Sequence, residues 1–227
     1  MIAHRPRSAV QAWHRWLPAL ACISALQLAV VALAGLLLAG PGGPRPAAAQ
    51  DMASAEAAWA ALRAGGAVVV LRHAQTVPGI GDPPGFRLED CATQRNLSDE
   101  GREQARRIGK ALQAAGVAVG EVLSSRWCRC LDTATEAFGR VTPWPAADSF
   151  FDRRAARSGD DPSARQTAEL RSRVAAYRGK DTLVVVTHQV NITALTGIVP
   201  AMGELVVLKP DRRNAGGFSV AGRLPAP

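Results

Sequence analysis

The sequence predicts an α/β domain, built as a three-layer sandwich in which helices flank a mostly parallel central sheet. Residues 67–71 and 181–187 are short, mostly β-branched apolar runs, which is typical of strands buried on both faces. Segments with helical periodicity alternate with such strands along the chain, and alternation of this kind favours a parallel sheet covered by helices. No internal repeat is visible.

The predicted elements follow this alternating order. An alanine-rich helix at 53–65 precedes the first strand, and a long Pro/Gly-rich loop at 74–96 follows it. Ser98 is expected to cap a helix that ends at Gly116. The other predicted elements are a strand at 117–123, a helix that opens at Ser124-Ser125 and runs to 138, a short strand at 141–144, a polar loop at 150–165, a helix at 163–178, the strand at 181–187, a short helix at 190–197, and closing strands at 204–208 and 217–220.

Residues 1–49 have the pattern of a secretory leader. A basic, acid-free start is followed by an uncharged apolar run from Leu17 to Ala39 and by a small-residue site at 47–49. The run is also long enough to cross a bilayer, so an uncleaved amino-terminal anchor is the alternative. In either case residues 50–227 are expected to form an exported domain, periplasmic or extracellular, which touches the inner membrane only if the segment stays uncleaved.

The charge of the chain favours a small anionic partner over nucleic acid. The formal net charge is +8, and four of the 27 basic residues lie in the acid-free leader, so the remainder carries +4. The basic residues are scattered and aromatic residues make up only 5% of the chain, which does not suit a surface that stacks bases. No residue cluster indicates a metal or another cofactor.

Three cysteines remain beyond the leader, and an odd number permits one disulfide at most. Cys128 and Cys130 are two positions apart on a predicted helix and point about 200° apart, so they are poor partners for each other. The apolar stripe of that helix consists of Trp127, Leu131, Ala134 and Phe138. It places Cys130 near the buried face and Cys128 near the edge, within reach of Cys91 in the long loop. We therefore predict a Cys91–Cys128 bridge, with three reduced thiols as the alternative.

Both strongly apolar strands end in histidine. VVVLRH places Arg72 and His73 after the first strand, and LVVVTH places His188 after the later one. The carboxyl ends of parallel strands share one edge of a sheet, where ligands bind, so the two imidazoles are expected to meet there.

A third strand leads to the same edge. It runs into Ser125 and a predicted helix start, whose amides and positive dipole suit an anion. Arg126 and Arg129 would lie in the first turns; we expect Arg126 on the solvated face and Arg129 in the site. Arginine pairs with phosphate oxygens through two parallel hydrogen bonds, so the sequence predicts a phosphate site.

These segments resemble the histidine phosphatase superfamily, the phosphoglycerate-mutase-like proteins. LRHAQT is similar to the RHG-type motif of that family, and SSRWCRCLDTA is similar to its second arginine segment. VTHQVNI resembles its second-histidine motif, and NLSDEGREQARRIGKAL resembles the helix between the first two motifs. The four segments occur in the family's order over residues 66–200, which implies a phosphoglycerate-mutase-like fold.

The resemblance also implies a mechanism. Neutral His73 would attack phosphorus, and water would then hydrolyse the phosphohistidine, while Arg72, Arg129 and His188 hold the equatorial oxygens. The general acid of the family falls on Asp152.

The sequence departs from the family pattern in three places. Ala74 and Gln189 replace the glycines after the two histidines, and the asparagine expected beyond the first motif is missing. Thr76, Gln189, Ser125 and Arg95 are the candidate substrate-binding residues.

The function implied by the resemblance is that of an exported phosphomonoesterase acting on a small phosphorylated molecule. The CATQRN loop and the leader make the chain similar to phosphatases of lipopolysaccharide core heptose phosphate, so a phosphosugar or an envelope glycolipid is the expected substrate. A phosphoglycerate-mutase-like phosphotransferase and a catalytically silent phospho-ligand-binding module are the alternatives.

Overall fold

The structure of the chain is a computed structural model that describes residues 47–151 and 163–227. Most of the predicted leader and most of the predicted polar loop at 150–165 lie outside these residues. Asp152, the predicted general acid, also lies outside them.

The centre of the domain is a six-stranded sheet in the order β3-β2-β4-β1-β5-β6. Its strands are β1 (Val68–Arg72), β2 (Val119–Ser124), β3 (Thr142–Pro143), β4 (Thr182–Thr187), β5 (Leu205–Pro210) and β6 (Phe218–Leu224). The first four strands along this order are parallel, while β5 and β6 are antiparallel to their neighbours. The sheet is mostly parallel, as predicted.

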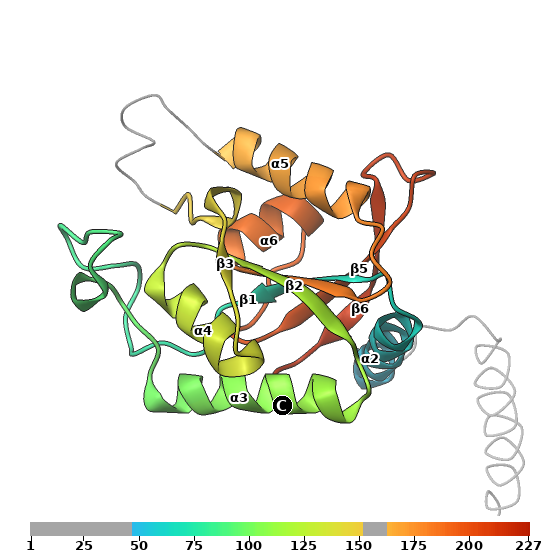
Figure 1. The fold of residues 1–227 in the computed structure, drawn as a ribbon, viewed down its shortest axis with the longest axis horizontal. Coiled ribbons are helices and arrows are strands. Elements are labelled where there is room, and N and C mark those ends of the chain that lie inside the picture. Colours follow the sequence, from blue (N-terminus) through green and yellow to red (C-terminus); the bar gives the residue numbers. More distant parts are fainter. Residues whose placement is uncertain (1–46, 152–162) are drawn as a thin grey trace, which may run out of the picture. The chain divides into compact units, whose positions relative to one another are not determined.

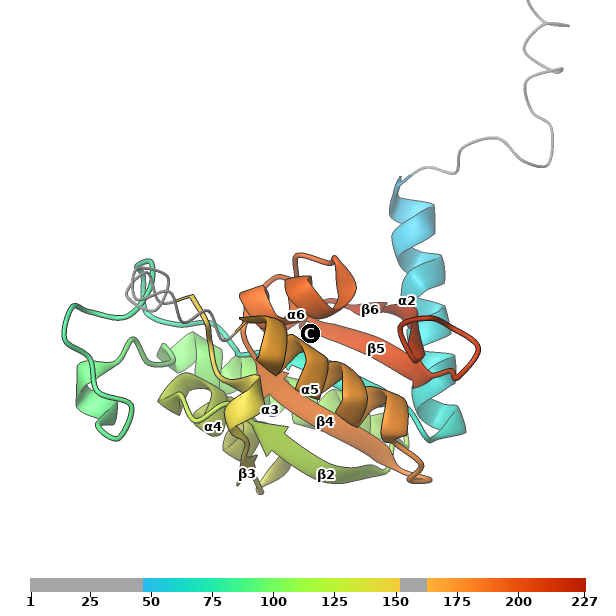
Figure 2. The ribbon, with the colours of Figure 1, turned by 90° about the horizontal axis from the view of Figure 1, so that it is seen from above.

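Helices cover both faces of the sheet (Figure 1). One layer contains α2 (Ala47–Ala64), α3 (Asp99–Ala114) and α4 (Cys128–Phe138), and the other contains α5 (Ser163–Ala176) and α6 (Gln189–Thr196). Short 3₁₀ turns lie at η1 (Cys91–Thr93) and η2 (Pro145–Ala147). Figure 2 shows α5 and α6 from above, lying over the sheet, with α5 running alongside β4. Within the described ranges, no helix is long and apolar enough to cross a membrane.

The apolar strands separate two hydrophobic cores. Val69 and Leu71 of β1 pack into the core beneath α2, α3 and α4, and Val68 and Val70 pack into the core beneath α5 and α6. Because successive side chains of a strand point to opposite faces, a strand between two layers needs apolar residues at every position. This is the physical reason why the unbroken apolar runs predicted a sheet buried on both faces.

Helix α3 supports the residues that follow β1. Ser98 caps it, as predicted, by accepting a hydrogen bond from the amide of Gly101 at 3.1 Å. A Cβ atom at Gly101 would lie 1.8 Å from the carbonyl oxygen of Gln75, so only glycine lets the helix approach this close. The backbone two residues after His73 is therefore held against α3.

Helices α2 and α4 begin several residues away from their predicted starts. Helix α2 begins at Ala47 rather than at 53, and α4 begins at Cys128 rather than at Ser124-Ser125. The residues between β2 and α4 are a short bend, with Trp127 as the N-cap. The residues that follow β2 at the site therefore belong to this bend and not to helix α4.

Candidate active site

The two predicted histidines meet at the carboxyl edge of the sheet. Strands β1 and β4 pair in register from Val68 with Leu183 to Arg72 with Thr187, so His73 and His188 leave adjacent strands at the same level. Their ring centroids are 5.5 Å apart. Both line a cavity of about 920 Å³ at this edge.

His73 is held as a neutral imidazole with a defined tautomer. Its Nδ1 lies 2.9 Å from the carbonyl oxygen of Ala74, which can only accept, so Nδ1 carries the proton and Nε2 keeps its lone pair. Burial and the positive charge of Arg129 lower the pKa of His73 to about 3; Arg72 and Arg95 act in the same direction, and the bond to Ala74 opposes them. His73 is therefore a free nucleophile throughout the neutral pH range.

Three arginines surround this nucleophile with unused donors. Arg72, Arg95 and Arg129 all line the cavity, and the Nε of each is buried without a hydrogen-bond partner. A buried, unsatisfied N–H costs about 1–3 kcal/mol, so three of them at one site favour an anionic acceptor.

Other atoms of the same guanidinium groups are fixed by the protein. Nη1 of Arg72 donates to the carbonyl oxygen of Pro200 at 2.7 Å, and Nη1 of Arg95 donates to that of Gly79 at 3.0 Å. Burial lowers the pKa of Arg72 and of Arg95; the charges of Arg95 and Arg129 lower that of Arg72 further, and the charge of Arg129 lowers that of Arg95. Arg72 and Arg95 are thus preorganised in a site with excess positive charge.

Asp82 is the acid among the described residues that line the cavity, and sequence reasoning did not find it. Its carboxylate pairs with Arg129 through Nη1 at 2.7 Å and Nη2 at 3.2 Å. Although burial by itself raises the pKa of Asp82, the hydrogen bond to Arg129 and its charge lower it overall. Asp82 is thus an ionised carboxylate. No sequence signal marked this residue, because it lies in the loop without periodicity.

His188 is supported from behind by a serine and a second unpredicted acid. Its Nε2 lies 2.8 Å from Oγ of Ser125, and this hydroxyl lies 3.3 Å from Oδ1 of Asp148. Burial, followed by the charge of Arg129, lowers the pKa of His188 well below its ordinary value. Ser125 is fully buried and is not among the described residues that line the cavity, so it contacts the second histidine where we predicted contact with substrate.

The turn before α4 does not offer its amides to an anion, contrary to our prediction. The amide of Arg126 donates to Asp148 at 2.8 Å, that of Trp127 to Ser125 Oγ at 3.3 Å, and that of Cys128 to Gln94 Oε1 at 3.0 Å. Arg126 is exposed to solvent, as predicted, but it precedes the helix and pairs with the buried carboxylate of Asp148. Guanidinium groups, rather than helix amides, supply the positive charge of the site.

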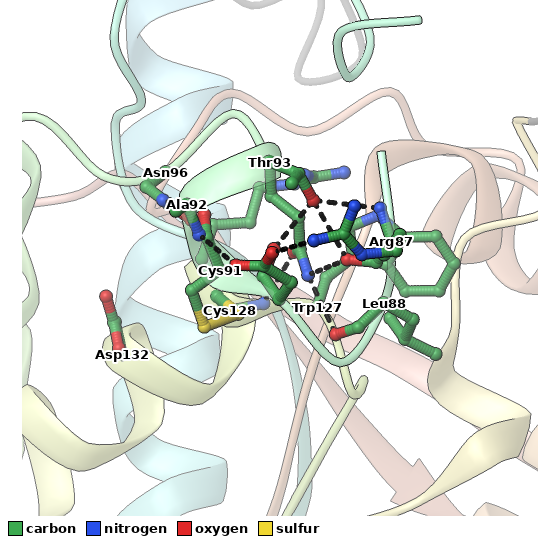
Figure 3. The surroundings of a disulfide bond; sticks show 12 residues. Arg87, Leu88, Cys91, Ala92, Thr93, Asn96, Trp127, Cys128 and Asp132 are labelled. Carbon is green, nitrogen blue, oxygen red and sulfur yellow. Dashed lines mark hydrogen bonds and ion pairs between the residues drawn. A yellow bond between two sulfur atoms is a disulfide. The ribbon is translucent and has the colours of Figure 1, made fainter. Parts of the chain in front are cut away.

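The predicted disulfide between Cys91 and Cys128 is confirmed, with the two Cα atoms 5.7 Å apart. Figure 3 shows how it links η1 of the long loop to the start of α4. Gln94 adds a second link, since its amide group donates to the carbonyl oxygen of Leu88 and accepts from the amide of Cys128. Cys130 is a buried free thiol 3.5 Å from Nε2 of His188.

The remaining predicted residues divide between the cavity and its surroundings. Gln189 and Arg95 line the cavity. Thr76 is buried behind Arg95, whose guanidinium donates to its hydroxyl, and is not among the described lining residues. Phe86 and Trp127, with ring centroids 5.9 Å apart, form an aromatic wall of the cavity. The space beyond the histidines therefore exceeds the needs of a phosphate group alone.

Part of the chain matches a known family. Residues 68–146 match the histidine phosphatase superfamily (branch 1). The matched segment contains Arg72, His73 and Arg129 and ends before His188. No curated protein matches the chain with significance.

Solved structures share the fold. The protein histidine phosphatase SixA, complexed with tungstate, is 15% identical with a TM-score of 0.50, and the match covers 70% of this chain and 96% of that one. Rv3214 of Mycobacterium tuberculosis is also 15% identical with a TM-score of 0.51, and its match covers 70% of this chain and 97% of that one. The predicted three-layer, phosphoglycerate-mutase-like fold is confirmed.

Proposed function

We propose that the chain is an exported phosphomonoesterase that works through a phosphohistidine on His73. The observation that carries the proposal is the neutral imidazole of His73 beside three buried arginine Nε–H groups without partners. A nucleophile surrounded by positioned cations suits phosphoryl transfer, in which positioning and charge stabilisation do most of the catalytic work. The family match over residues 68–146 supports the same chemistry.

The reaction proceeds in two transfers. Nε2 of His73 forms a bond to phosphorus as the ester P–O bond breaks, and the departing alcohol takes a proton, for which Asp152 is our predicted donor. Water then attacks the phosphohistidine and gives a proton to the acid that protonated the alcohol, the N–P bond breaks, and the electron pair returns to Nε2 as inorganic phosphate forms. Arg72, Arg129 and His188 surround the oxygens in both steps.

The substrate is proposed to carry more than its phosphate into the cavity. The aromatic wall of Phe86 and Trp127 suits the apolar face of a sugar ring or another non-polar group. A phosphosugar or the head group of an envelope glycolipid fits this wall together with the positive site. The leader pattern of residues 1–49 supports a location outside the cytoplasm, with a periplasmic substrate.

The test is phosphate release from a generic aryl phosphate in water without any other acceptor. We expect wild-type protein to release phosphate, and rapid quenching during turnover to trap acid-labile phosphate on His73. His73→Ala should abolish both signals while circular dichroism stays unchanged, since the residue follows β1 rather than filling a core. Full activity in the variant, or label on another residue, would disprove the mechanism; transfer without hydrolysis would indicate a phosphotransferase.

A further inference from the structure

We propose that Asp82 is a positioning residue that grips one edge of the Arg129 guanidinium and so presents the Nε edge to phosphate. The proposal rests on the proposed function, because it assigns a role within the same anion site. The sequence motifs do not include Asp82, which lies in the Pro/Gly-rich loop between His73 and Cys91.

The geometry of the pair leaves a defined edge of Arg129 unused. Both Asp82 oxygens meet the Nη1 and Nη2 end of the guanidinium, at 2.7 Å and 3.2 Å, while Nε of Arg129 is buried without a partner. A guanidinium has a planar set of donors in fixed directions. Fixing the Nη end therefore also fixes the direction in which the Nε–H points.

The carboxylate of Asp82 is anchored as part of the protein framework. Besides Arg129, Oδ1 accepts from the amide of Arg95 at 3.0 Å and Oδ2 accepts from Nε1 of Trp127 at 3.0 Å. Each oxygen thus accepts two hydrogen bonds, and the side chain is only 8% exposed. An incoming phosphate that displaced Asp82 would have to break all four bonds, whereas a phosphate on the Nε edge breaks none.

Asp82 also reduces the charge repulsion in the site. Arg72, Arg95 and Arg129 line one cavity, and the positive charge of Arg129 acts unfavourably on both of the other guanidinium groups. One fixed carboxylate compensates part of this charge and leaves a net positive site for the substrate. The Asp82 carboxylate can therefore orient Arg129 before phosphate arrives, while Arg129 remains able to bind phosphate.

The first experiment measures binding of inorganic phosphate by calorimetry to wild type, Asp82→Ala and Asp82→Asn. We expect the two variants to bind phosphate about 10- to 100-fold more weakly, as with other supporting contacts behind a ligand-binding group. Glu89→Gln removes a charge from the same loop at an exposed site and should bind like wild type. Tighter phosphate binding in Asp82→Ala would overturn the proposal, since it would make Asp82 a competitor of phosphate.

A double-mutant cycle with Arg129→Lys separates positioning from general damage. If Asp82 acts through Arg129, Asp82→Ala should cost less than about threefold in phosphate affinity once Arg129 is lysine. An equal loss in both backgrounds would show that Asp82 acts elsewhere and would overturn the proposal. If Asp82→Ala lowers the melting temperature too far, Asp82→Asn, which keeps the size and an acceptor oxygen, takes its place in the cycle.

Binding and turnover separate this proposal from the proposed function. Wild type that binds phosphate but releases none from esters would refute the phosphatase activity, while the Asp82 variants would still test positioning. Wild type that turns over esters, with Asp82 variants unchanged in phosphate affinity and in KM, would refute only the role of Asp82.

Discussion

Loss of the Cys91–Cys128 disulfide should weaken both the fold and the site. The bridge joins residues 37 positions apart and attaches the loop that contains Asp82 and Arg95 to the helix that contains Arg129. Reduction would leave Gln94 as the neighbouring link between this loop and α4. The expected perturbation is a less stable protein with a less ordered anion site.

The size of the stability change follows from the length of the closed loop. Closing a loop of this length restricts the unfolded chain by about 4 kcal/mol, and strain commonly reduces the realised value, so we expect a loss of about 2–4 kcal/mol. For a domain of this size, that loss lowers the melting temperature by roughly 4–16 °C. The value of kcat/KM should fall about threefold or more, mainly through KM, since the bridge orders binding groups rather than the nucleophile.

The assay compares wild type with Cys91→Ser, each with and without reductant. Wild type should lose stability and activity on reduction, whereas Cys91→Ser should start at the reduced values and show no response. Among the cysteines of residues 50–227, Cys130 should be the one free thiol in non-reduced wild type, and it should be protected because it is buried. Free thiols at Cys91, Cys128 and Cys130 before reduction, or equal melting temperatures with and without reductant, would refute the reasoning.

Two further predictions concern charge. Arg129→Lys should lower kcat/KM about 100-fold although it keeps the charge. A lysine ammonium lacks the two donor edges with which a guanidinium can bind Asp82 and phosphate at the same time. Near-normal kinetics would place Arg129 outside the anion site. The stability of the protein should fall as the pH drops from 6.5 toward about 3, because unfolded His73 takes up a proton while native His73 stays neutral. Each histidine that stays neutral in the native state changes the free energy of unfolding by about 1.4 kcal/mol per pH unit. Urea unfolding at pH 7, 6 and 5 should therefore give a free energy of unfolding that depends less on pH in His73→Ala than in wild type. An equal pH dependence in the two proteins would contradict the lowered pKa.

The sequence predicted the sheet, the meeting of the two histidines and, with three reduced thiols as the alternative, the disulfide. Strands buried on both faces need continuous apolar runs, and these runs are visible in VVVL and TLVVV. Parallel strands share their carboxyl edge, so His73 and His188 had to approach each other once both strands were assigned. The choice of Cys128 over Cys130 followed from helix geometry together with the position of the apolar stripe on that helix.

Only the tertiary structure showed what surrounds these residues. Asp82 and Asp148 find their partners 47 and 22 residues away, through a loop and a turn that have no periodic pattern to predict them. Helix α4 begins after Ser125 because side-chain acceptors take the amides of the preceding turn, and this places Ser125 behind His188. Local sequence determines which strands and helices form and where they end. The partners of a buried polar group depend on which distant segments fold over it, and only the complete fold decides that.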